Sequence, residues 1–163
     1  MNYFQITKCD MLNGDGIRVV LWVAGCSHHC KGCQNAYTWD CTAGLPFTDE
    51  VKQELFNALA EDYINGITFS GGDPLFTGNR AAIAQLIKEI KQKFPTKTIW
   101  LYSGYLYEDI RTFDEIKPVL NDIDVIVDGP FVESLKDDHY KWAGSTNQRV
   151  LTREMRCALD KAE

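Results

Sequence analysis

The chain has 163 residues, of which 45% are hydrophobic and 25% charged, and its formal net charge is −6. This length is that of one domain of about 100–200 residues, and the composition excludes a disordered chain. The acidic balance argues against nucleic acid as a partner, because nucleic acids select basic surfaces. No apolar run approaches the roughly 18–20 residues of a membrane span, and the N-terminus lacks the pattern of a signal peptide. We therefore expect a single soluble, cytoplasmic domain over residues 1–163.

Strand-like and helix-like segments alternate along the chain. The β-branched and aromatic run at 17–23 predicts a parallel strand buried on both faces. The later predicted segments, in chain order, are a helix from the N-cap Thr48 to Tyr63, a strand at 67–69, a helix over 83–94, a strand at 98–103, a weak helical region from 106 that breaks around Pro118, a strand at 123–127, a fifth strand at 148–151 and a short or frayed helix from 152.

Repeated strand–helix order predicts an α/β fold with a mainly parallel sheet and right-handed crossovers. A complete eightfold barrel normally needs about 250 residues, so the chain is too short for one. An open, partial β/α barrel or a doubly wound sheet remains. In both folds, ligands bind beyond the carboxyl ends of the strands. The unusual residues follow predicted strands: a cysteine loop, Gly71-Gly72-Asp73, Ser103-Gly104 and Asp128-Gly129.

Three of the six cysteines, Cys26, Cys30 and Cys33, form a C-x3-C-x2-C pattern after the first of these strands. Clustered thiolates suit an iron–sulfur cluster, zinc or copper(I). A 4Fe–4S cluster for electron transfer takes four cysteines, one for each iron, so three would leave one iron open to a substrate or cofactor. The alternative is a closed zinc site in which His28 or His29 supplies the fourth ligand, although both are more simply interpreted as loop residues.

Isolated residues elsewhere have simpler interpretations. Cys9, Cys41 and Cys157 are interpreted as ordinary thiols, and Trp22, Trp100 and Trp142 as core or interface aromatics. Asp128 ends a hydrophobic strand, where a carboxylate is costly unless it is paired or solvated. It fits a site residue as well as the turn residue of Asp128-Gly129-Pro130.

The C-x3-C-x2-C pattern after a first strand resembles the signature of the radical S-adenosylmethionine superfamily. Within it, several motifs resemble one family, the activators of the anaerobic, class III ribonucleotide reductases. These motifs lie at 13–18, 32–35, 38–39, 70–75, 103–105, 127–129 and 144–148. The resemblance runs from about residue 2 to 151, with a core at about 14–151.

The resemblance implies a partial radical S-adenosylmethionine barrel in which Cys26, Cys30 and Cys33 hold one 4Fe–4S cluster. The open iron would chelate the amino and carboxylate groups of S-adenosylmethionine. The residues that the resemblance places at this cofactor are Gly32, Cys33, Gln34, Gly71, Gly72 and Asp73.

Three of these positions, Gln34, Gly71 and Gly72, either differ from the family pattern or have a second explanation. Family members usually have an aromatic residue where this chain has Gln34, so a contact beside the adenine is altered here. The pair Gly71-Gly72 is equally explained by a tight strand-to-helix turn.

The implied reaction begins when a low-potential donor such as flavodoxin reduces the cluster. Reductive cleavage of S-adenosylmethionine then gives methionine and a 5′-deoxyadenosyl radical, which takes a hydrogen atom from a glycine of the reductase large subunit. No catalytic residue is expected beyond the ligands of the cluster and cofactor. The alternatives are another radical S-adenosylmethionine enzyme, which activates a different glycyl radical enzyme or acts in deazapurine synthesis, and a non-catalytic zinc-binding module.

Overall fold

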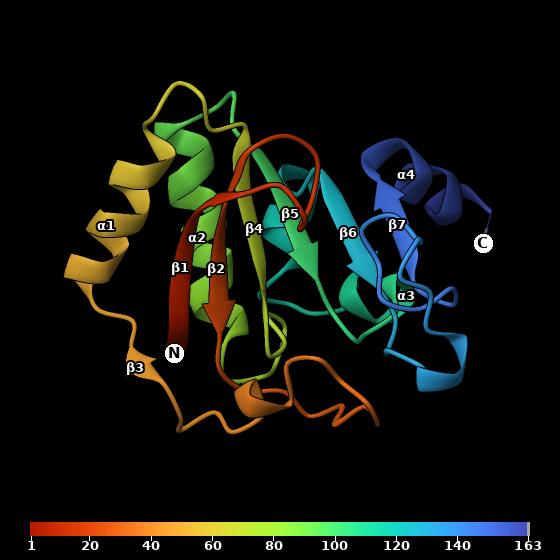
Figure 1. The fold of residues 1–163 in the computed structure, drawn as a ribbon. Helices are drawn as coiled ribbons and strands as arrows, with labels where there is room; N and C mark the ends of the chain where they lie inside the picture. Colours follow the sequence, from red (N-terminus) through yellow and green to blue (C-terminus); the bar gives the residue numbers. More distant parts are fainter. Residues whose placement is uncertain (163) are drawn as a thin grey trace.

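The computed structural model describes residues 1–162, which contain seven strands in one open sheet (Figure 1). The spatial order is β3-β1-β2-β4-β5-β6-β7. The strands are β1 (Asn2–Asp10), β2 (Arg18–Val23), β3 (Leu45–Pro46), β4 (Gly66–Gly71), β5 (Thr98–Tyr102), β6 (Val125–Asp128) and β7 (Arg149–Thr152). The central strands β2, β4, β5 and β6 are parallel, whereas β1, β3 and β7 pair antiparallel at the edges. The predicted α/β class with a parallel centre is confirmed.

Helices lie between the parallel strands along the chain, and one more helix follows β7. They are α1 (Asp49–Leu59), α2 (Arg80–Lys93), α3 (Tyr107–Ile110) and α4 (Arg153–Lys161), with short 3-10 turns η1 (Ala36–Thr38), η2 (Lys117–Asp122) and η3 (Glu133–Leu135). Thr48 caps α1 as predicted, by accepting a hydrogen bond from Val51 N. The helix ends at Leu59 rather than at Tyr63, because Tyr63 is exposed and so does not continue the buried stripe that its spacing indicated.

The two faces of the central strands have different neighbours, because successive side chains of a strand point to opposite sides. Val19 and Leu21 of β2 lie in the main core, beneath α1 and α2. Trp100 and Tyr102 of β5 belong to a smaller apolar cluster on the opposite face, and the side chain of Trp22 is half-buried. In Figure 1, α2 passes behind the sheet, so the opposite face is turned toward the viewer.

Two antiparallel strands, β1 and β3, were not recognised in the sequence. Residues 2–10 form β1, which pairs with β2, yet none of them is fully buried. Because β1 is only partly buried, it lacks the continuous apolar run that identified β2. The fifth predicted strand is present as β7, and it runs antiparallel to β6. Among residues 1–162, no helix has the length and apolar character needed to cross a membrane.

Candidate functional site

A cleft of about 870 Å³ opens at the carboxyl ends of the parallel strands. Cys26, Cys30 and Cys33 all line it. The other three cysteines, Cys9, Cys41 and Cys157, are exposed and do not line the cleft, and all six are free thiols. The structure therefore separates the predicted ligands from the predicted ordinary thiols.

The loop that carries the three cysteines, residues 24–35, is anchored at its start by neighbouring backbone. Gly25 N donates to Thr38 O at 2.8 Å, and Cys26 N donates to Trp39 O at 3.0 Å. Gly25 has φ +99°, in the region that favours glycine, and its backbone turns the chain away from β2. These contacts fix where the loop leaves the sheet and so fix its first thiol.

Burial affects the chemistry of two of the thiols. Loss of solvent raises the pKa of Cys26 and of Cys30, although nearby backbone donors offset part of the effect. Both thiols are therefore protonated at neutral pH in the chain alone, and a metal or cluster must displace their protons on binding. Within residues 1–162, no three Cys, His, Asp or Glu side chains converge closely enough to hold a single metal ion.

Asp73, the last residue of the predicted glycine–glycine–aspartate motif, is buried and joins two strand ends. Its carboxylate accepts hydrogen bonds from Leu75 N at 2.7 Å, from Ser103 Oγ at 3.0 and 3.1 Å and from Gly104 N at 3.0 Å. Ser103 and Gly104 follow β5, so the carboxylate ties the end of β4 to the end of β5. Sequence reasoning noted the Ser103-Gly104 motif but gave it no partner.

The two glycines of this motif allow the turn after β4 to pack closely against the start of the cysteine loop. Gly71 has φ +105°, so the turn after β4 needs glycine. At Gly72, an added Cβ would lie 2.5 Å from Gly25 O. Asp73 N donates to that same Gly25 oxygen at 2.7 Å. The absence of side chains thus lets the β4 turn contact the start of the cysteine loop directly.

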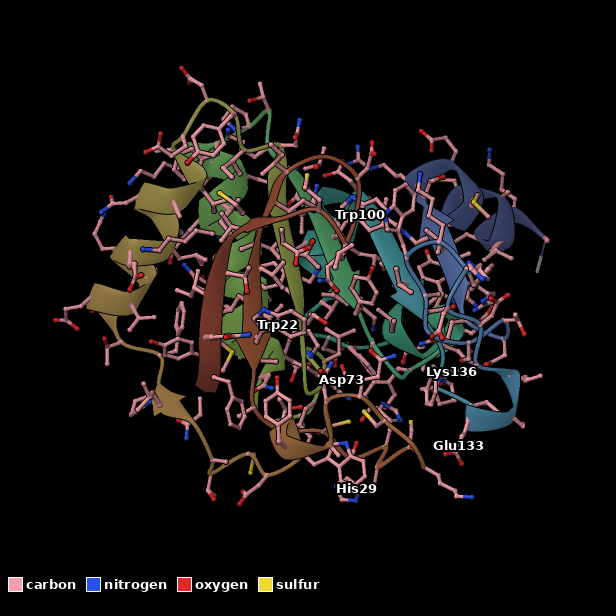
Figure 2. The ribbon with its side chains drawn as sticks, in the orientation of Figure 1. Trp22, His29, Asp73, Trp100, Glu133 and Lys136 are labelled. Carbon is pink, nitrogen blue, oxygen red and sulfur yellow. The ribbon has the colours of Figure 1, made fainter. Side chains whose placement is uncertain are left out.

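His28 extends from the cysteine loop toward Asp73. Its Nε2 lies 2.9 Å from Asp73 Oδ2, yet this buried nitrogen makes no hydrogen bond within the described residues. The imidazole ring packs edge-on against Tyr105, whose hydroxyl is 3.2 Å from Ser27 Oγ. The His29 ring instead lies against the Trp39 ring, and the two ring centroids are 4.8 Å apart. Figure 2 shows Asp73 near the strand ends and His29 on the outer side of the loop.

The remaining predicted residues lie in different places. Gln34 lines the cleft beside Cys33, whereas Gly32 packs against Glu133 of η3, where an added Cβ would lie 2.7 Å from Oε1. Asp128 is fully buried and does not line the cleft. Arg149 donates to both of its oxygens, which identifies the Asp128 carboxylate as part of an ion pair between β6 and β7.

Relatives found by comparison with known proteins carry the same name. A family model described as a 4Fe-4S single cluster domain matches residues 12–151. The "Anaerobic ribonucleoside-triphosphate reductase-activating protein" of Enterobacteria phage T4 is 45% identical over 150 residues, which cover 92% of this chain and 93% of that protein.

Cellular relatives of the same name are similar over the same extent. The protein of Vibrio cholerae is 39% identical and that of Escherichia coli K12 is 41% identical, each over 92% of this chain and 97% of the relative. Identity at this level over nearly the full length of both chains is sufficient to assign the family. This chain belongs to the family of anaerobic ribonucleoside-triphosphate reductase-activating proteins.

Proposed function

We propose that the chain activates an anaerobic ribonucleoside-triphosphate reductase by forming a glycyl radical in its large subunit. The observation that carries the proposal is the placement of three thiols and Asp73 around one cleft at the carboxyl ends of parallel strands. The names of the relatives supply the partner. An open sheet with the cysteine loop after the first parallel strand is also what a partial radical S-adenosylmethionine barrel requires, and we include that fold in the proposal.

The residues present fit a 4Fe–4S cluster with three protein ligands. Cys26, Cys30 and Cys33 would hold it, since thiolates are the ligands that such clusters take. A closed zinc site would need a fourth ligand. The Nε2 atom of His28 lies near Asp73 and the ring of His29 lies against Trp39, an arrangement that favours the cluster over zinc. When bound, the cluster and S-adenosylmethionine supply reductive cleavage of a carbon–sulfur bond and the hydrogen-atom abstraction that follows.

For the cofactor, we propose contacts at the residues that the resemblance indicated: Gly32, Cys33, Gln34, Gly71, Gly72 and Asp73. Asp73 has a specific part in this proposal. Its Oδ1 already accepts from Leu75 N and Ser103 Oγ, and its Oδ2 accepts from Ser103 Oγ and Gly104 N. A cofactor ammonium that binds Oδ2 would take the place that His28 Nε2 now occupies. We infer that Asp73 aligns the strand ends and attracts the ammonium, while Gln34 contacts the cofactor through its backbone or amide.

The electron donor and the compartment follow from the same chemistry. A low-potential donor such as flavodoxin would reduce the cluster at the cysteine loop, whose Lys31 side chain is almost fully exposed. Six free thiols are compatible with a reducing cytoplasm. We include both in the proposal.

The decisive experiment is anaerobic reconstitution with iron and sulfide, followed by electron paramagnetic resonance of the reduced chain with and without S-adenosylmethionine. We expect a 4Fe–4S⁺ signal that changes when the cofactor is added, formation of 5′-deoxyadenosine, and a glycyl radical once the reductase large subunit is present. A colourless protein that contains zinc would overturn the proposal. Cleavage of the cofactor with no glycyl radical in the reductase would indicate a different radical S-adenosylmethionine enzyme.

A further inference from the structure

The cleft extends well beyond the cysteines along the helix-free face of the sheet. Its lining continues through Trp22 and Tyr102 to Trp142 and to the loop that bears Met11 and Leu12. In Figure 2 the labelled Trp22 and Trp100 lie successively farther from His29 along this face. A volume of about 870 Å³ is near the upper end of the roughly 300–1,000 Å³ of ligand pockets. The cleft therefore has a half that the thiols and Asp73 do not use. We call it the apolar half after its large side chains Met11, Leu12, Trp22 and Trp142, although Asp137, Asp138, His139 and Lys141 also line the cleft.

Met11 and Leu12 present large apolar side chains to solvent on an ordered loop. They are 72% and 82% exposed. Asp10 Oδ1 accepts hydrogen bonds from Leu12 N at 2.9 Å and Asn13 N at 2.7 Å, and Thr68 Oγ1 donates to Asn13 O at 2.7 Å. Scattered exposed apolar residues need no explanation, but an adjacent pair fixed at the edge of a functional cleft indicates an interaction site.

A second part of the lining of this half is built around Trp142. Its ring packs edge-on against Trp100, with centroids 4.8 Å apart, and Lys141 Nζ lies 4.0 Å from its centroid. Trp142 has φ +65°, which is uncommon for a residue other than glycine. Such backbone persists where the surroundings hold it in place, and it is frequent at ligand clamps. The lining of the apolar half thus includes the Met11–Leu12 loop and the segment around Trp142.

We propose that Met11 and Leu12 form a docking rim for the glycine-bearing segment of the reductase large subunit, an inference that rests on the proposed function. The glycine Cα must reach a cofactor at the thiol end of the cleft, so the residues that flank it must lie in the rest of the cleft. The six residues of β2 span about 20 Å, enough for several residues of an extended segment along the sheet. Apolar side chains next to the glycine fit the half lined by Met11, Leu12 and Trp142, where a flexible methionine adapts to the partner.

The experiment compares wild-type chain with a Met11→Ser/Leu12→Ser double variant, both reconstituted with the cluster. Glycyl radical formation is measured by electron paramagnetic resonance over a range of reductase concentrations. Cleavage of S-adenosylmethionine by dithionite-reduced chain without reductase is measured in parallel. We expect the apparent KM for the reductase to rise about tenfold or more, as for the loss of one or two buried anchors, while cleavage without reductase is retained. A Leu45→Ser/Met155→Ser variant is the matched control, because both residues are exposed and outside the cleft lining.

Each other outcome overturns the inference. An unchanged KM in the double variant means that the rim does not bind the reductase. Equal losses in both reactions mean that the loop supports the cofactor site instead. A change of oligomeric state in sedimentation velocity, with the KM unchanged, means that the rim joins two copies of this chain. A wild-type chain that cleaves the cofactor but forms no glycyl radical overturns the proposed function and this inference with it.

Discussion

Two carboxylates at the ends of parallel strands, one on each side of β5, have opposite surroundings. Asp73 follows β4 and Asp128 ends β6, and both are almost completely buried. Three neutral groups of the chain donate to Asp73: Leu75 N, Ser103 Oγ and Gly104 N. Asp128 accepts from the guanidinium of Arg149 and from Tyr107 N at 2.7 Å. Asp73 lines the cleft, whereas Asp128 does not.

The difference separates a carboxylate that faces the cleft from one that pairs with an arginine outside the cleft lining. Asp128 is neutralised by Arg149, which also contacts Glu108 through two hydrogen bonds of 3.1 and 2.7 Å. This network joins β6, β7 and α3, and Arg149 occupies both oxygens of Asp128 outside the cleft lining. Asp73 keeps a carboxylate that has no arginine or lysine partner among the described residues and lies 2.9 Å from His28 Nε2 of the cysteine loop. We therefore expect changes near Asp73 to affect activity and changes near Asp128 to affect folding.

The largest loss of activity is expected from Cys30→Ala, in the cleft that Asp73 also lines. Loss of one of three ligands should abolish the cluster and with it all cleavage of S-adenosylmethionine. The thiol is only half-buried, so the free energy of unfolding of the cluster-free chain should change by less than about 1 kcal/mol. Iron and sulfide analysis measures the first effect and urea unfolding the second. Cys157→Ala, at an exposed thiol, should keep the full cluster; retention of full iron content in Cys30→Ala would refute the assignment of ligands.

A smaller but still large loss of activity is expected from Asp73→Asn. The amide keeps the shape but removes the negative charge and replaces one acceptor oxygen with a donor that faces other donors. Cleavage of S-adenosylmethionine should fall roughly 100-fold, which corresponds to about 2.7 kcal/mol of transition-state stabilisation. The rate and the affinity for the cofactor should be measured at full cluster occupancy. Activity like that of wild type would mean that Asp73, like Asp128, is only structural.

For Asp128→Ala the expected loss is in stability, of about 2–3 kcal/mol. The change leaves Tyr107 N without its acceptor and removes one of the two carboxylates that neutralise Arg149. Because Arg149 retains Glu108 and is partly exposed, the cost is below that of a fully buried unpaired charge. Urea unfolding of the cluster-free chain measures it. Glu54→Ala, which removes a solvent-exposed pair with Lys8, should change the free energy of unfolding far less than Asp128→Ala does. If the two variants lost equal stability, the network would be no more than a surface contact.

The grouping of Cys26, Cys30 and Cys33 at one cleft could be predicted because the three thiols lie within eight residues of one loop, where spacing alone carries the information. The roles of Asp73 and Asp128 could not be separated in the same way. Their partners, Ser103 and Arg149, come from 30 and 21 residues farther along the chain. Those contacts depend on how neighbouring strands align, which a pattern within one strand does not specify.

The same limit applies to the edges of the fold. The central strands were found because continuous apolar runs report burial on both faces. β1 was missed because its residues are only partly buried, and its pairing with β2 is a long-range property. The apolar half of the cleft was also missed. Its tryptophans were interpreted as core or interface residues, and Met11 and Leu12 form part of it only because their loop packs across Asn13 and Thr68.

The smallest effect is expected from Glu108→Gln, which weakens the outer part of the Asp128 network. The hydrogen bonds from Arg149 hold the pKa of Glu108 below its usual value of 4.5. A carboxyl with a lowered pKa in the folded chain stabilises it above that usual value, and the contribution is lost as the pH falls through the lowered pKa. Because Glu108 is more than one-third exposed, solvent limits the contribution to less than about 1 kcal/mol. Unfolding of the cluster-free chains between about pH 6 and pH 2 should therefore show a shallower loss of stability for Glu108→Gln than for wild type. Parallel pH profiles would mean that Arg149 stabilises the fold through Asp128 alone, and the comparison with Asp73 would then rest on a single buried ion pair.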